Sequence, residues 1–171
     1  MDARKSTAIN VLSETATVNT DVHNSDMSVA KERTTVRLDF GLFTLNNGDR
    51  IRLFGTPGLH RFDLLWKIFS KGALGLIILA DNSRPDPLAD MSVYLNRFSE
   101  QLDTVPCAIG VGVGRLDTHP HPSLDHYANL LAEKNRIFPV IGVDVRRKDD
   151  VILLIDTLLM QLESGISGVQ S

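Results

Sequence analysis

The stretch Leu53-Phe54-Gly55-Thr56-Pro57-Gly58-Leu59-His60-Arg61-Phe62 decides how the rest of the chain is interpreted. A short apolar strand at 50–54 leads into a turn bounded by two glycines, and an aromatic-rich helical pattern begins at Arg61. Such a turn places a backbone N–H where a terminal phosphate can accept it, and then continues into a helix. Three further motifs support this interpretation: Lys5-Ser6-Thr7, Thr35 with Asp39-Phe40, and Leu116-Asp117.

The residues before this turn predict a hairpin preceded by a helix and a loop. Alternation from Val36 places Val36, Leu38, Phe40 and Leu42 on one face of a strand. Asn46-Asn47-Gly48-Asp49 is a strong turn signal, so the strand at 50–54 returns antiparallel to the first. Residues 1–14 predict a short amphipathic helix, with Ile9 and Leu12 at helical spacing. Residues 15–33 are polar, and we expect a long surface loop there.

The residues after the turn alternate between apolar runs and amphipathic patterns. We expect buried strands at 73–80, 106–113 and 138–143. We expect helices at 88–102 and 124–134, the second capped by Ser123. Val151, Ile155, Leu158 and Leu162 predict the inward stripe of a final helix, and the tail 164–171 is expected to be frayed.

This order of strands and helices indicates a three-layer α/β fold. The expected sheet is mostly parallel, with helices on both faces and one antiparallel hairpin strand. Ligands of such sheets bind at the carboxyl ends of the strands. The loops expected there surround Gly55, Asp81, Gly114 and Asp144.

Composition narrows the class of protein. The 171 residues suit a single domain, 1–171, of ordinary composition, with 43% hydrophobic and 23% charged residues. A net charge of −3 makes nucleic acid a poor partner. No apolar segment approaches membrane-spanning length and no signal-peptide pattern is present, so we expect a cytoplasmic protein.

With this order and spacing, the chain resembles the Ras-like small GTPases. It looks closest to the bacterial branch that carries Gly-Thr-Pro-Gly in its second switch, and the resemblance extends from Lys5 to the final helix. It implies a P-loop NTPase-like G domain that binds GTP or GDP with Mg²⁺. Residues 1–14 would then be the remnant of the phosphate loop and first helix, and 15–35 the first switch loop. Roadblock-type regulatory proteins are the suspected partners.

The resemblance implies roles for residues at the phosphates. Lys5, Ser6 and Thr7 match the end of the phosphate-binding loop, and Ser6 and Thr35 would ligate Mg²⁺. The N–H of Gly58 would report the third phosphate, while Gly55 replaces the usual second-switch aspartate.

The resemblance also implies roles at the base and in hydrolysis. Asp117 would accept hydrogen bonds from guanine, Arg115 would lie over the base, and Asp144 with Val145 would form the last base-contacting loop. Leu59 takes the place of the glutamine that orients the attacking water, so hydrolysis is expected to be slow or impaired. His60 is a weaker candidate for that role.

The chain departs from the small-GTPase pattern in two ways, and more than one explanation and function remain open. Arg4 replaces the glycine before Lys5, and no apolar strand precedes the phosphate-loop remnant, so we expect the family's first strand to be missing. A start placed too late, a truncated copy and a degenerate gene product would each explain this. The first functional hypothesis is a GTP-binding switch. The alternatives are a pseudo-GTPase that serves as a protein-interaction module and, third, an ATP-binding relative.

Overall fold

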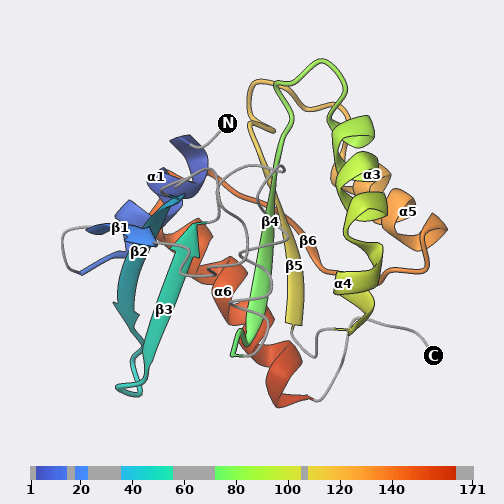
Figure 1. Cartoon of the computed structure of the whole chain (residues 1–171). Coiled ribbons are helices and arrows are strands. Elements are labelled where there is room, and N and C mark those ends of the chain that lie inside the picture. Colours follow the sequence, from blue (N-terminus) through green and yellow to red (C-terminus); the bar gives the residue numbers. More distant parts are fainter. Residues whose placement is uncertain (1–2, 15–17, 23–35, 56–71, 105–107, 165–171) are drawn as a thin grey trace, which may run out of the picture. The chain divides into compact units, whose positions relative to one another are not determined.

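The chain has a mixed α/β fold with two separate sheets. The computed structural model describes residues 3–14, 18–22, 36–55, 72–104 and 108–164 (Figure 1). It divides into two compact units, Met1–Leu65 and Trp66–Ser171. One unit holds a three-stranded antiparallel sheet, and the other a three-stranded parallel sheet.

The first unit contains one helix and a meander of strands. Helix α1 spans Ala3–Leu12, and the strands are β1 (Val18–Val22), β2 (Val36–Thr44) and β3 (Arg50–Gly55). The sheet order is β1-β2-β3, with every pair antiparallel. The hairpin prediction is confirmed, and Gly48 has a φ of +92°, which a glycine adopts without steric cost.

Helix α1 packs on one face of this sheet because two glycines let it approach closely. The Ile9 side chain lies over Gly41 of β2 and Gly55 of β3, and a Cβ at Gly41 would be 2.6 Å from Ile9 Cγ2. Ile9 and Leu12 are both buried, as their spacing predicts. The face that α1 covers also carries buried Phe43, so the predicted stripe that includes Phe40 and Leu42 lies on the opposite face.

The prediction of a loop throughout 15–33 is wrong at Val18–Val22. This segment is strand β1, which pairs with β2 from Val18 opposite Phe40 to Val22 opposite Val36. Its sequence, Val-Asn-Thr-Asp-Val, is too short and too polar to show an apolar alternation. The strand therefore depends on the backbone hydrogen bonds that β2 supplies across the ladder.

The second unit alternates strands and helices. Its elements are β4 (Gly75–Asp81), α3 (Pro87–Arg97), α4 (Ser99–Thr104), β5 (Ala108–Gly114), α5 (Leu124–Glu133), β6 (Val140–Gly142) and α6 (Lys148–Glu163). The strands are parallel in the order β4-β5-β6. The predicted strands are confirmed, with a shift of one or two residues at every end, and Ser123 is the N-cap of α5 as expected.

The helix predicted at 88–102 is two helices in the structure. Helix α3 ends at its C-cap residue Phe98, and α4 begins at the next residue. The guanidinium of Arg136 donates to the Ser99 carbonyl at 3.1 Å and so satisfies that backbone group from outside the helix. The apolar stripe still continues through the break, because Leu95, Phe98 and Leu102 are all buried.

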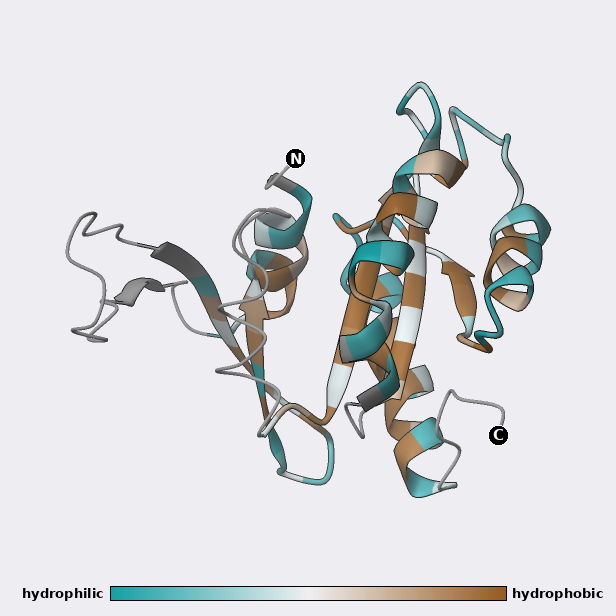
Figure 2. Cartoon of the chain, turned by 45° about the vertical axis from the view of Figure 1, so that its right-hand side comes forward, coloured by the Kyte–Doolittle hydropathy of each residue, from teal (hydrophilic) through white to brown (hydrophobic). Residues whose placement is uncertain are grey.

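Helices cover both faces of the parallel sheet. All residues of β5 before Gly114 are buried, which requires cover on each side. Helix α6 lies over Gly110 and Gly112, where Leu154 and Leu158 fill the space that a Cβ would take. The prediction for α6 is wrong at Leu162, which is 36% exposed, and Leu154 at 1% exposure belongs to the inward stripe instead. Figure 2 shows the hydrophobic residues of β4 and β5 in brown.

The single, mostly parallel sheet stays a prediction. Within the described ranges, β1, β2 and β3 form one ladder and β4, β5 and β6 form another, with no hydrogen-bonded pair between them. The mixed α/β class and the parallel sheet are confirmed.

Candidate functional site

Three loops leave the carboxyl edge of the parallel sheet. They follow Asp81 of β4, Gly114 of β5 and Gly142 of β6. Loops at this edge are where open α/β sheets bind their ligands. Four of the residues singled out from the sequence lie here: Arg115, Asp117, Asp144 and Val145.

The loop after β5 folds into a tight turn around Arg115. This residue has a φ of +68°, a conformation that non-glycine residues rarely adopt. Its carbonyl accepts from the N–H of Thr118 at 3.3 Å and from the N–H of His119 at 2.8 Å. The turn leaves the side chains of Arg115 and Asp117 exposed, so both are accessible to a ligand.

A buried amide fixes this loop to the end of β4. Asn82 is 2% exposed, and its Nδ2 donates to the carbonyls of His119 and Pro122 at 2.7 and 2.8 Å. Its Oδ1 accepts from the Tyr127 hydroxyl at 2.8 Å. Burial and the negative charges of Asp81 and Asp90 raise the pKa of Tyr127 to about 12, which keeps that hydroxyl protonated as a donor. The sequence analysis missed Asn82, although a polar residue directly after an apolar strand is a signal for such a role.

The loop after β6 carries an ion pair. Arg146 donates from Nε and Nη2 to the two carboxylate oxygens of Asp144, at 2.8 and 2.7 Å, and its backbone N–H donates to Oδ1 at 3.0 Å. These bonds lower the pKa of Asp144 to about 2. Asp150 of α6 accepts the backbone N–H of Asp144 at 2.9 Å.

The two loops interact electrostatically. Asp144 and, more weakly, Asp117 raise the pKa of Arg146, because negative charge close to a guanidinium favours its protonated form. The turn after β5 also reaches β6, where Leu116 Cδ1 fills the space beside Gly142. The structure therefore brings together Asp117, Asp144 and Arg146, of which the sequence analysis did not select Arg146.

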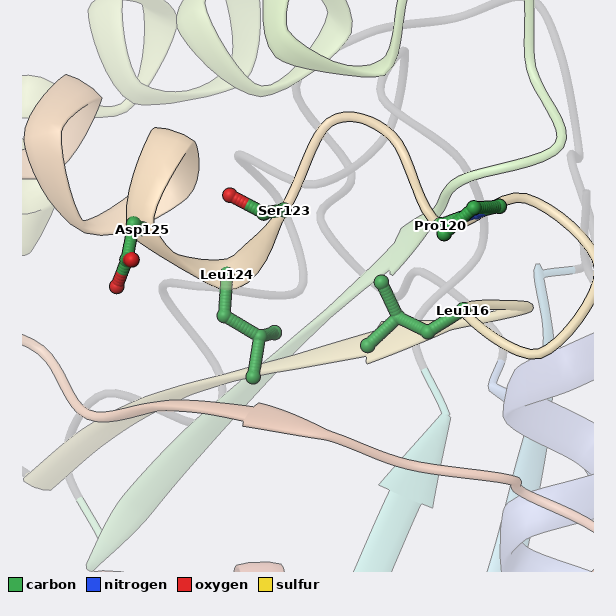
Figure 3. A pocket seen from close by; sticks show the side chains of 5 residues that line it. All are labelled: Leu116, Pro120, Ser123, Leu124 and Asp125. Atoms are coloured by element: carbon green, nitrogen blue, oxygen red, sulfur yellow. The ribbon is translucent and has the colours of Figure 1, made fainter.

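A shallow depression lies beside these residues. Its volume is about 410 Å³, and its lining comprises Leu116, Pro120, Ser123, Leu124 and Asp125 (Figure 3). Leu116 and Leu124 come from the loop and from the start of α5, and Asp125 points away from them (Figure 3). Arg115, Asp117 and Asp144 do not line it. The depression, lined by three apolar side chains together with Ser123 and Asp125, is therefore separate from these three residues.

The second group of predicted site residues lies on α1. Lys5, Ser6 and Thr7 fall within the first turns of this helix, and the Ser6 hydroxyl donates to the carboxylate of Asp39 on β2. Asp39 is paired with Gly55 across the β2–β3 ladder. The structure thus brings Ser6 and Gly55 into one neighbourhood and adds Asp39, which the sequence analysis used as a motif marker but not as a site residue.

The donor chemistry of this neighbourhood fits Mg²⁺. Hydroxyl and carboxylate oxygens are its preferred protein ligands, and it commonly uses one or two of them with substrate phosphates. In the described part of the chain, no three side chains of His, Cys, Asp or Glu gather so as to hold a metal ion on their own. Thr35, Gly58, Leu59 and His60 lie outside the described residues, so their roles stay predictions.

No family model matches this chain, and no curated protein is similar enough to count as a match. The helices within the described ranges include none with the length and apolar character needed to cross a bilayer.

Proposed function

We propose that this chain is a small-GTPase-like switch that binds a guanine nucleotide and hydrolyses it slowly or not at all. The observation that carries the proposal is the gathering of Asp117, Asp144 and Arg146 at the carboxyl edge of the parallel sheet. This edge is the ligand-binding edge of open α/β sheets, and Asn82 fixes the loop that presents Asp117.

The base would be recognised by the loop after β5. The carboxylate of Asp117 is exposed and can accept two hydrogen bonds from guanine, at N1–H and at the exocyclic amine, which adenine does not offer. The aliphatic part of Arg115 would lie over the base. Asp144 and Val145 would approach it from the loop after β6.

The phosphates would be held by the residues that the resemblance to small GTPases assigns to them. The ammonium of Lys5 supplies positive charge near the start of α1, where the helix dipole also favours an anion. Ser6 and Thr35 are the residues that would hold Mg²⁺, which neutralises charge on the outer phosphates when it is bound. The N–H of Gly58 would contact the third phosphate. Leu59 offers no hydrogen bond to a water, so we expect turnover to be slow, with His60 as the weaker candidate for positioning that water.

Replacement of Asp117 by asparagine tests the base-binding role. Asp117→Asn removes an acceptor and adds a donor, so the affinity for guanine nucleotides should fall at least about ten-fold while that for xanthine nucleotides rises. Calorimetric titration of both variants measures this, with Asp125→Asn on α5 as the matched control. An unchanged affinity for GTP would refute the assignment. Equal affinity of the unmodified chain for ATP and GTP would favour the ATP-binding alternative.

One observation favours the second candidate, a pseudo-GTPase that serves as a protein-interaction module. The Ser6 hydroxyl already donates to Asp39, and both carboxylate oxygens of Asp144 are engaged by Arg146. A chain whose polar groups satisfy one another needs no nucleotide to complete its folded state. The nucleotide content of the protein after gentle purification separates the two, because a switch retains GDP or GTP and an interaction module does not. Roadblock-type regulators remain the proposed partners in either case.

A further inference from the structure

Leu116 lies in the turn after β5, between the two charged residues of that turn. It is the only apolar residue in the stretch 115–119. Arg115 and Asp117 are exposed, whereas Leu116 is half-buried. It comes three residues after Val113, which is paired with Gly142 across the β5–β6 ladder. The sequence places Leu116 next to Asp117, and the structure shows what it packs against.

A glycine in β6 makes room for this side chain. A Cβ at Gly142 would be 2.8 Å from Leu116 Cδ1 and 4.0 Å from Leu124 Cδ1. The φ of Gly142 lies outside the left-handed region, so its absent side chain provides space and no special backbone conformation. Leu116 and Leu124 both lie over β6 (Figure 3). A side chain at position 142 would therefore displace Leu116.

Asp117 lies between this contact and a second anchor of the same loop. Two residues beyond it, the N–H of His119 donates to the Arg115 carbonyl at 2.8 Å. The His119 carbonyl accepts from the side chain of Asn82 at 2.7 Å. Asn82 thus fixes one end of the turn to β4, and Leu116 fixes the other end to β6. The Asp117 carboxylate is exposed, but the backbone on both sides of it is held.

We propose that Leu116 is a positioning residue for base selection. Its contact with Gly142 holds the Asp117 carboxylate where it can accept from both N1–H and the exocyclic amine of guanine. This inference rests on the proposed binding of a guanine nucleotide. Two simultaneous hydrogen bonds require a fixed carboxylate, because such bonds weaken steeply with misalignment.

Hypoxanthine distinguishes a held carboxylate from a loose one. This base has the N1–H of guanine and lacks the exocyclic amine, so it offers Asp117 one donor in place of two. When the turn leaves its held position, the bond to the amine is lost and the two bases bind alike. A purely structural role of Leu116 predicts another result, because a smaller folded fraction weakens both nucleotides equally and leaves their ratio unchanged.

The ratio of the dissociation constants of IDP and GDP tests the proposal. Calorimetric titration of the full-length chain with Mg²⁺ should show GDP binding at least about ten-fold more tightly than IDP. In Leu116→Ala the ratio should fall below about three-fold. Gly142→Val fills the space that Leu116 occupies and should lower the ratio to a similar extent. The double variant should show no further fall, because the two substitutions break the same contact.

Two variants serve as controls. Leu124→Ala removes a side chain that lies over the same glycine and lines the same depression, but that is not adjacent to Asp117, so the ratio should be unchanged. Leu116→Met keeps an apolar side chain of similar volume and should retain the ratio. Hydrogen exchange of the His119 N–H follows the turn without nucleotide, and it should be faster in Leu116→Ala than in Leu124→Ala.

The outcomes separate this inference from the proposed function. A chain that binds GDP, and whose ratio Leu116→Ala leaves intact, would overturn the role of Leu116 while the proposed function stands. Equal affinity of the unmodified chain for GDP and IDP would also overturn it. A chain that binds neither nucleotide would overturn the proposed function and this inference with it.

Discussion

At the scale of single residues, Asn82 and Asp144 show how the site is held. Asn82 occupies a buried position at the end of β4 and joins three partners through its side chain, two carbonyls of the loop 119–122 and the hydroxyl of Tyr127. Asp144 is bound by Arg146 at the end of β6. Each keeps its loop in place by hydrogen bonds that the apolar pattern of the sequence does not reveal.

Asn82→Ala should destabilise the protein far more than the loss of a single hydrogen bond to Asn82. The substitution leaves two carbonyls and one hydroxyl without their partner in a buried place, and we expect the free energy of unfolding to fall by about 2–4 kcal/mol. Tyr127→Phe removes one of the three bonds and should lower it by about 1 kcal/mol. Urea denaturation of both variants measures the difference. Equal effects would show that the two carbonyl contacts contribute nothing.

Asp144 should make the free energy of unfolding depend on pH in the acid range. Its folded pKa of about 2 is lower than the ordinary value of about 4, so its contribution is present above pH 4 and is lost as the pH falls through 2. In Arg146→Ala the pKa of the carboxyl should rise toward its ordinary value without reaching it, because the side-chain bonds are lost while the backbone N–H of residue 146 still donates to Oδ1. NMR titration of the Asp144 carboxyl carbon follows this. The control is Arg147→Ala, since the Arg147 side chain acts on the Asp144 carboxylate only through its charge; a pKa still near 2 in Arg146→Ala would contradict the assigned cause.

At the scale of elements, the position of α1 depends on a contact between a helix and a sheet glycine. Gly41 lies beneath Ile9, so the residues proposed to meet the phosphates are placed by a contact about one turn further along α1. The sequence predicts the helix and the strand separately. It does not show that they meet, because a glycine in a strand is equally compatible with a bulge or with close packing.

Gly41→Ala should destabilise the first unit by about 1–3 kcal/mol, because the new methyl group would collide with Ile9 Cγ2. Ile9→Ala removes the colliding group, so the double variant should be less destabilised than the sum of the two single variants by about 1 kcal/mol or more. Gly72→Ala is the control, since nothing lies within 4 Å of the position of its Cβ. Thermal denaturation of the four proteins in the cycle measures the coupling. Strict additivity would show that α1 does not rest on Gly41.

At the scale of the whole molecule, the proposed nucleotide should stabilise the folded chain. A ligand that binds only the folded state at one hundred times its dissociation constant stabilises it by about 2.7 kcal/mol. For a chain of this length, that corresponds to a rise in Tm of roughly 5–10 °C. We therefore expect GDP with Mg²⁺ to raise the Tm, and removal of Mg²⁺ by a chelator to reverse much of the rise. ADP at the same concentration is the control, and a Tm unaffected by GDP would count against the switch and for the interaction module.

Much of the second unit follows from its sequence. The strands at β4 and β5, the N-cap at Ser123 and the buried residues Val151, Ile155 and Leu158 are all predicted by local patterns. These patterns work because apolar periodicity and capping depend on residues a few positions apart. The same holds for the β2–β3 hairpin, whose turn is set by four consecutive residues.

By itself, the sequence determined the mixed α/β class, the parallel strands, the hairpin and the loops that carry Asp117 and Asp144. Only the tertiary structure decided that Val18–Val22 is a strand, that Leu162 is exposed, that Ser6 meets Asp39 and that Asn82 holds the loop after β5. The reason is physical: each of these features depends on a partner distant in the chain or on where a helix meets its neighbours. Such contacts leave no local periodicity, because the hydrogen bond or the covered surface exists only once the segments have packed together.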